Sequence, residues 1–138
     1  MSTPGILVDT GPLVALLVRG EAHHEWAAAV ATQLEPPLYT CDAVLVETCH
    51  LVTRLSGNPA PVLEMVERGL VRLHFSLHDE FEPVRKLMHR YRDVPMSLAD
   101  ACLVRMSELH TGARIFTLDS DFRIYRRLGR QAIPQIAP

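Results

Sequence analysis

The sequence predicts a three-layer α/β/α domain in which a central, mostly parallel sheet of four to five strands lies between helices. Apolar segments of strand length alternate with longer segments of helical periodicity along the whole chain. The first apolar segment, Ile6-Leu7-Val8, is entirely aliphatic, which is typical of a strand buried on both faces of a parallel sheet. Because no repeat or linker divides the chain, residues 1–138 are expected to form one domain.

In the first half of the chain, turn and cap residues separate the expected elements. Pro12 lies near the start of a helix, Gly20 is a candidate C-cap, and Pro36-Pro37 stops the next helix. Asp42 is a candidate N-cap, and Gly57 lies in the turn that ends the helix after it. The elements expected in order are a strand at 6–8, helices at 12–18 and 21–34, a strand at 38–41, and helices at 43–55 and 61–68.

Similar signals divide the second half. Gly69 is a candidate C-cap before an alternating strand, Ser97 begins a long helix, and Gly112 follows its end. Pro134 favours an edge position for the last strand, because proline has no N–H to donate. The elements expected in order are a strand at 70–75, helices at 81–91 and 97–110, a strand at 114–118, a short helix at 122–128 and an edge strand at 131–136.

The composition is that of a soluble globular protein, with 48% hydrophobic and 22% charged residues. We find no signal peptide and no apolar segment long enough to span a bilayer, so a cytoplasmic protein without membrane contact is expected. The net charge of −2 provides no overall basic field for a polyanion. Three cysteines without a CxxC spacing favour buried thiols over disulfides or zinc ligands.

Four acidic side chains stand in otherwise apolar segments. Asp9 and Asp119 each follow a predicted strand, whereas Glu47 and Asp100 each interrupt an apolar run of a predicted helix. In a doubly wound sheet, strand ends and the first turns of flanking helices can face one crevice. Carboxylates gathered there repel one another unless they are protonated or matched by a cation. Because none of the four segments contains a lysine, we expect Mg²⁺ or Mn²⁺, which prefer oxygen ligands, to provide the match.

Each acid also has a purely structural interpretation. Asp9 and Asp119 could simply cap the helices that follow them. Asp100 follows Ser97 at the spacing of a capping box, and an acid in a first helical turn suits the helix dipole. Glu47 shares a helical stripe with other polar side chains and could lie on a solvated face. The residues alone leave both interpretations open.

Four motifs in chain order carry a resemblance to a known family. They are Leu7-Val8-Asp9-Thr10-Gly11, Val46-Glu47, Leu98-Ala99-Asp100-Ala101 and Thr117-Leu118-Asp119-Ser120-Asp121-Phe122. With these motifs the chain resembles, over nearly its whole length, the PIN-domain nucleases and among them the small VapC-type toxins. The resemblance implies a PIN-like domain and a Mg²⁺- or Mn²⁺-dependent endoribonuclease, the toxin of a type II toxin–antitoxin pair.

The resemblance also implies roles for individual residues. Catalysis would depend on Asp9, Glu47, Asp100 and Asp119. Metal binding would involve Asp9, Asp100, Asp119 and Asp121. Thr10 and Thr117 would support the ligands with their hydroxyls. Glu47 is either a ligand or a base that orients the attacking water, and the sequence does not decide between these roles.

An RNA substrate, a small antitoxin and a homodimer are the partners that the resemblance implies. The antitoxin would bind the apolar surface near the early helices, around Trp26, and direct a basic residue toward the carboxylates. The candidates for RNA contact are Arg123, Arg126 and Arg127, in the helix expected at 122–128, although a solvated helix face is the favoured explanation for them.

Three other functions compete with a toxin. One is a non-catalytic PIN-like domain that binds RNA or protein, in which the acids serve as helix caps. Another is a stand-alone RNA-processing nuclease without an antitoxin. Phosphoryl transfer to an aspartate of Asp119-Ser120-Asp121 is disfavoured, because Lys86 does not follow a strand and the motif lies close to the C-terminus.

Overall fold

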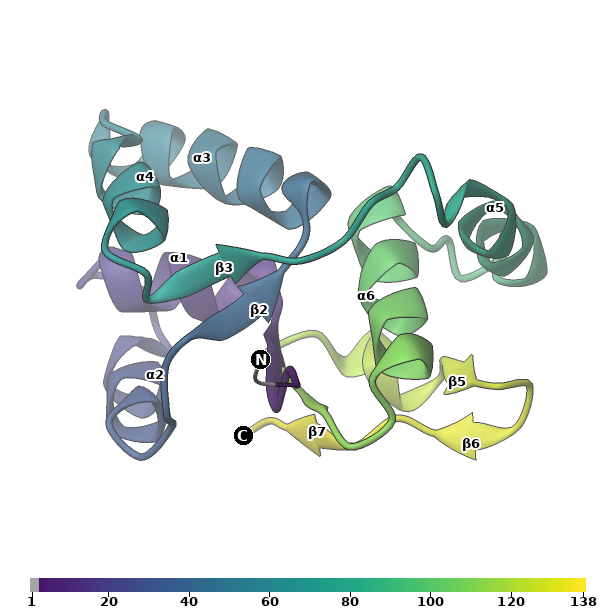
Figure 1. The fold of residues 1–138 in the computed structure, drawn as a ribbon. Coiled ribbons are helices and arrows are strands. Elements are labelled where there is room, and N and C mark those ends of the chain that lie inside the picture. Colours follow the sequence, from purple (N-terminus) through teal and green to yellow (C-terminus); the bar gives the residue numbers. More distant parts are fainter. Residues whose placement is uncertain (1–2) are drawn as a thin grey trace.

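A five-stranded parallel sheet forms the centre of the computed structural model, which describes residues 3–138 (Figure 1). The order of its strands is β3-β2-β1-β4-β7, and every neighbouring pair is parallel. The strands are β1 (Ile6–Val8), β2 (Leu38–Thr40), β3 (Val71–Leu73), β4 (Arg114–Phe116) and β7 (Gln135–Ile136). The predicted α/β class with a parallel sheet is confirmed.

Six α-helices flank the sheet within the described residues. They are α1 (Thr10–Leu17), α2 (His24–Ala31), α3 (Asp42–Ser56), α4 (Ala60–Glu67), α5 (Phe81–Arg90) and α6 (Leu98–Leu109). Figure 1 shows α5 and α6 on one side of the strands and α1 to α4 on the other. None of these helices has the length and apolar composition that crossing a bilayer requires.

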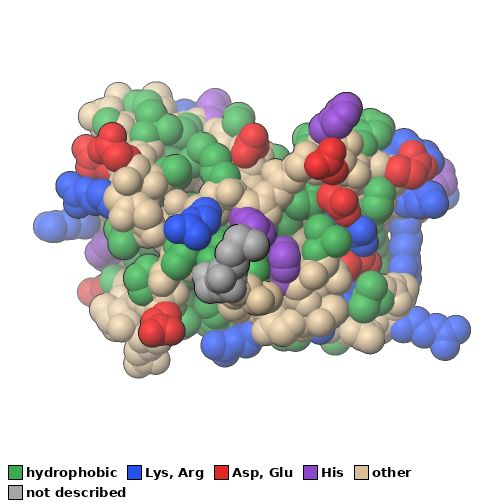
Figure 2. Space-filling model, viewed as in Figure 1, with side chains coloured by type: hydrophobic (Ala, Val, Ile, Leu, Met, Phe, Trp, Pro, Cys, Tyr) green, Lys and Arg blue, Asp and Glu red, His purple; other side chains and the backbone are tan. Residues whose placement is uncertain are grey.

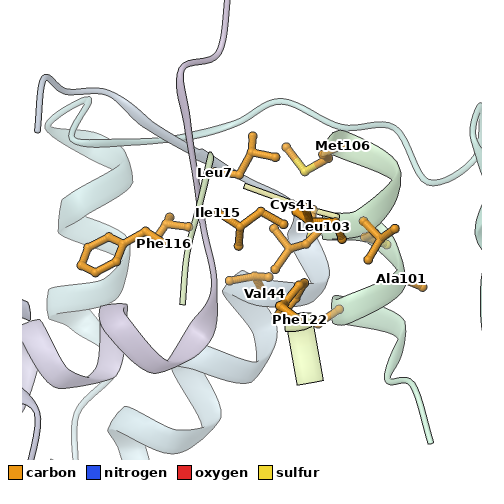
Figure 3. Close-up of a cluster of buried hydrophobic side chains, with 14 of the residues drawn as sticks. Leu7, Cys41, Val44, Ala101, Leu103, Met106, Ile115, Phe116 and Phe122 are labelled. Carbon is orange, nitrogen blue, oxygen red and sulfur yellow. The ribbon is translucent and has the colours of Figure 1, made fainter. Parts of the chain in front are cut away.

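Alternation along the central strands divides the core between the two faces of the sheet. Leu7 and Ile115 are register partners on β1 and β4, and they point toward Leu103 and Met106 of α6 (Figure 3). Phe116 points the opposite way, where its ring meets Trp26 of α2 at a centroid distance of 5.6 Å. Burial of both faces explains why these strands read as continuous apolar runs.

The order of the strands places a switch point between β1 and β4. The chain proceeds from β1 outward to β2 and β3, and then returns through α5 and α6 to β4 on the other side of β1. Crevices for ligands form at such switch points, beyond the carboxyl ends of the strands. Asp9 follows β1 at this position, and its N–H donates to the Phe116 carbonyl at the end of β4 at 3.0 Å.

The helix expected at 122–128 is wrong. The segment contains the 3₁₀ helix η1 (Ser120–Arg123), followed by an antiparallel hairpin of β5 (Arg126–Arg127) and β6 (Gln131–Ala132). Leu128 and Gly129 have φ angles of 50° and 85°, so the chain reverses there instead of continuing a helix. The edge strand expected at 131–136 is correspondingly divided between β6 of the hairpin and β7 of the main sheet.

Several boundaries also differ from the expected ones. Helix α1 starts at Thr10, directly after the cap Asp9, and α2 is shorter than the expected 21–34. Asp42 is the first residue of α3 and not its N-cap, which is Cys41. These shifts of a few residues leave the acidic positions on the predicted elements.

Candidate metal centre

Three carboxylates converge at the switch point of the sheet. Asp9 comes from the end of β1, Asp100 from the first turn of α6, and Asp119 from the loop after β4. Each of the three offers a carboxylate oxygen within 4.8 Å of the others. Asp9 is 6% exposed and Asp100 is 9% exposed. The structure therefore brings together three of the four acids that the sequence predicted to meet.

Thr117 connects two of these carboxylates. Its Oγ1 donates a hydrogen bond of 2.8 Å to Oδ2 of Asp9 and accepts one of 2.9 Å from the N–H of Asp119. The other oxygen of Asp9, Oδ1, accepts the Thr10 N–H at 2.7 Å and so caps α1. The capping interpretation of Asp9 is thus correct, and it is compatible with a place in the cluster.

Asp100 is held by a cap and by a tyrosine. Its N–H donates to Oγ of Ser97 at 3.0 Å, as the capping-box spacing predicted. Its Oδ2 accepts a hydrogen bond of 2.8 Å from Oη of Tyr125, a fully buried side chain. Sequence reasoning did not identify Tyr125. The one signal for it is general, because a buried tyrosine hydroxyl usually requires a partner.

Burial makes the charged forms of the central carboxylates unfavourable. The pKa of Asp9 is raised to about 7, mainly by burial and to a smaller extent by the charges of Asp100 and Asp119, whereas the hydrogen bonds from Thr117 and Thr10 oppose the rise. Burial also raises the pKa of Asp100, and the charges of Asp119 and Glu47 add to this effect. Within residues 3–138, no arginine, lysine or histidine forms an ion pair with the cluster. The carboxylates therefore require protons or an external cation.

A pocket of about 610 Å³ opens beside the cluster and includes all three aspartates in its wall. Glu47 also lies on this wall, exposed on α3, but it is not among the acids whose oxygens converge. It is close enough to Asp100 for its charge to act on the pKa of that carboxyl. This position suits a side chain that acts on a molecule in the pocket.

The residues present fit a hard divalent ion. All three converging donors are carboxylate oxygens, the ligands that Mg²⁺ and Mn²⁺ prefer. The hydroxyl of Thr10 lines the same pocket and is buried, with the side chain 3% exposed. Its Oγ1 has no hydrogen-bond partner among the described residues. A buried polar atom without a partner beside a carboxylate cluster is the arrangement expected where a water or an ion belongs.

The remaining predicted site residues lie outside this pocket. Asp121 is half-buried, and its N–H donates to Oδ1 of Asp119 at 2.9 Å, which caps η1. Arg126 and Arg127 donate to backbone carbonyls, including Ser107 O at 3.2 Å from the buried Arg127. Arg123 is exposed. The three arginines share no helical face, because they lie on η1 and the hairpin.

Comparisons with known proteins identify the family of this chain. A model of the PIN domain matches residues 6–128. The structure of VapC20 of Mycobacterium tuberculosis, described as a toxin that cleaves the sarcin-ricin loop, is similar to this chain with a TM-score of 0.72 and 27% sequence identity. The similarity covers 85% of this chain and 92% of VapC20. A comparison with curated protein sequences found no match. Because the matched residues include the strands and helices that carry the acidic cluster, this chain belongs to the PIN-domain family.

Proposed function

We propose that the protein is a Mg²⁺- or Mn²⁺-dependent endoribonuclease that hydrolyses phosphodiester bonds of RNA. The observation that carries the proposal is the convergence of Asp9, Asp100 and Asp119 in a pocket, where no basic side chain of residues 3–138 forms an ion pair with them. An RNA substrate is supported by the similarity to VapC20, which is described as cleaving the sarcin-ricin loop.

The position of each side chain in the site supports a different role in this reaction. Asp9, Asp100 and Asp119 would hold the metal, which when bound would activate water and stabilise charge on the phosphate. Glu47, exposed on the pocket wall, would orient the attacking water or accept its proton. Thr117 would keep Asp9 and Asp119 in place through its two hydrogen bonds. Asp121 would assist at a second ion, and Thr10 would donate to a ligand in the pocket.

The proposal further includes the role of a toxin. The likeness over most of both chains to VapC20, which is described as a toxin, supports this role. A small antitoxin partner and a homodimeric state belong to the proposal through the resemblance that the four acidic motifs carry. A short neighbouring reading frame for a DNA-binding protein, whose product restores growth to cells that express this chain, is the expected finding. A stand-alone processing nuclease would slow no growth and would have no such neighbour.

A non-catalytic binding domain is the second candidate. The observation that favours it is that Asp9 and Asp119 each cap the helical turn that follows, so both acids have a structural role without any metal. A domain of this kind would bind RNA or protein without metal-dependent cleavage.

Cleavage of structured RNAs with Mg²⁺, with EDTA, and by Asp100→Asn distinguishes these candidates. The nuclease predicts cleavage that EDTA and Asp100→Asn both abolish, together with an increase in thermal stability when Mn²⁺ is added to the wild-type protein. Asp79→Asn is the matched control, because Asp79 is exposed and lies outside the pocket. Cleavage of equal rate in all samples would indicate a contaminating nuclease and remove the proposal.

A further inference from the structure

The pocket that contains the carboxylates also contains a basic side chain at its other end. Besides the aspartates, its wall includes Glu21 and Glu47, so five acidic side chains face a substrate that is itself a polyanion. Arg54 is the only arginine or lysine among the described residues that line this pocket. Apart from a metal ion at the carboxylates, Arg54 is therefore the strong positive charge among the described residues that a phosphodiester strand would meet in the pocket.

Arg54 is available to a ligand. It is exposed, and within residues 3–138 its guanidinium has no hydrogen bond or ion pair with another residue. The other arginines near the site differ in this respect. Arg126 donates to three carbonyls of its own turn, and Arg127 is buried against α6.

The spacing along α3 sets the distance between the two ends. Arg54 follows Glu47 by seven residues, so both lie on the same face of the helix, about 10 Å apart along its axis. Leu51 lies between them on the pocket wall, and Val14 and Leu55 extend this apolar surface. The carboxylates, an apolar surface and a cation therefore follow one another along the pocket. An RNA strand offers a matching series, in which a phosphate is followed by a nucleoside and then by the next phosphate.

We propose that Arg54 binds a non-scissile phosphate of the RNA strand whose scissile phosphate lies at the carboxylate cluster. The inference rests on the proposed function and adds to it a substrate contact. Arginine suits this contact, because its planar guanidinium can donate two parallel hydrogen bonds to a phosphate. On the face that Figure 2 presents, acidic and basic side chains are interspersed. Because the net charge of −2 provides no overall basic field, a local contact of this kind carries more of the electrostatic attraction.

The test compares Arg54→Gln with Arg54→Lys and with Arg85→Gln. Arg85 is an exposed arginine of α5 outside the pocket. Its substitution makes the same change in net charge as Arg54→Gln but leaves the pocket wall intact. The probe is a fluorescein-labelled single-stranded RNA of mixed sequence. Its binding to each variant is measured in buffers that contain Ca²⁺, at several salt concentrations. Mn²⁺ affinity is measured by calorimetry, and the KM and kcat for the same RNA are measured in Mg²⁺.

Arg54→Gln is expected to bind RNA about fourfold more weakly at 0.15 M salt, because one lost phosphate contact lowers the slope of log Kd against log salt by about 0.7. Its KM should rise in the same proportion, with kcat and Mn²⁺ affinity unchanged. Arg54→Lys should retain most of the slope, and Arg85→Gln should match the wild type.

Three results would overturn the inference while leaving the nuclease intact. Arg54→Gln could keep the wild-type RNA affinity and salt slope. Arg85→Gln could weaken binding as much as Arg54→Gln, which would make net charge the cause. Arg54→Gln could lose Mn²⁺ affinity in proportion to RNA affinity, which would place its effect at the metal. A wild-type protein that neither binds Mn²⁺ nor cleaves RNA would instead refute the proposed function itself.

Discussion

Oη of Tyr125 donates a hydrogen bond of 2.8 Å to Oδ2 of Asp100, between two side chains that are buried at the switch point of the sheet. Burial, followed by this bond, raises the pKa of the Tyr125 hydroxyl, which therefore remains a donor at neutral pH. Edge-to-face contacts with Tyr91 and Phe122, at centroid distances of 5.1 and 5.3 Å, fix the ring of Tyr125. The direction of the Asp100 carboxylate thus depends on an aromatic cluster from a distant part of the chain.

Tyr125→Phe should lower the affinity for Mn²⁺ about tenfold without unfolding the protein, since partners that orient metal ligands typically contribute this much. Calorimetric titration with Mn²⁺ measures the effect. Tyr91→Phe is the matched control, because the Tyr91 hydroxyl accepts the Arg126 N–H at 2.8 Å and does not bond to an acid of the cluster. Equal Mn²⁺ affinities of Tyr125→Phe and the wild type would show that this bond does not position a ligand.

Thr117→Val should destabilise the metal-free protein by about 1–3 kcal/mol, because it leaves an oxygen of Asp9 and the N–H of Asp119 without their buried partner. Urea unfolding in EDTA measures the change. Thr117→Ser keeps the hydroxyl and serves as the control, with a smaller loss of about 1 kcal/mol for the missing methyl group. A Thr117→Ser variant as unstable as Thr117→Val would assign the loss to packing.

The pKa of Asp9 predicts a dependence of stability on pH in the absence of metal. Because folding raises this pKa from 3.8 to about 7, the folded state holds a proton that the unfolded state releases in that interval. The free energy of unfolding should therefore fall by about 2–3 kcal/mol between pH 5 and pH 8, relative to Asp9→Asn measured in the same way. Urea titrations in EDTA at the two pH values test this. Parallel pH profiles of the wild type and Asp9→Asn would contradict it.

The acids themselves were accessible to sequence reasoning because their signals are local. Asp9 ends an aliphatic run and precedes Thr10-Gly11-Pro12, which marks the end of a buried strand. Asp100 lies three residues after Ser97, which marks the first turn of a helix. In a parallel sheet such positions lie at one edge, so the convergence of Asp9, Asp100 and Asp119 could be expected. Their roles in metal binding and catalysis stay predictions.

The C-terminal segment shows where local reasoning failed. Asp119 and Asp121 suit the start of a helix, and the structure does contain the helical turn η1 there. The turn at Leu128 and Gly129, with the pairing of β5 and β6, then competes with a longer helix. In this arrangement Tyr125 and Arg127 are buried and donate hydrogen bonds to Asp100 and Ser107 of α6.

By itself, the sequence determined the parallel sheet and the positions of the acids on its elements, because strand runs, caps and turns depend on residues only a few places apart. The tertiary structure alone decided that Tyr125 reaches Asp100, that Arg54 shares a pocket with the carboxylates, and that burial raises the pKa of Asp9. Each of these depends on distance and burial between segments far apart in the chain, which no local pattern encodes.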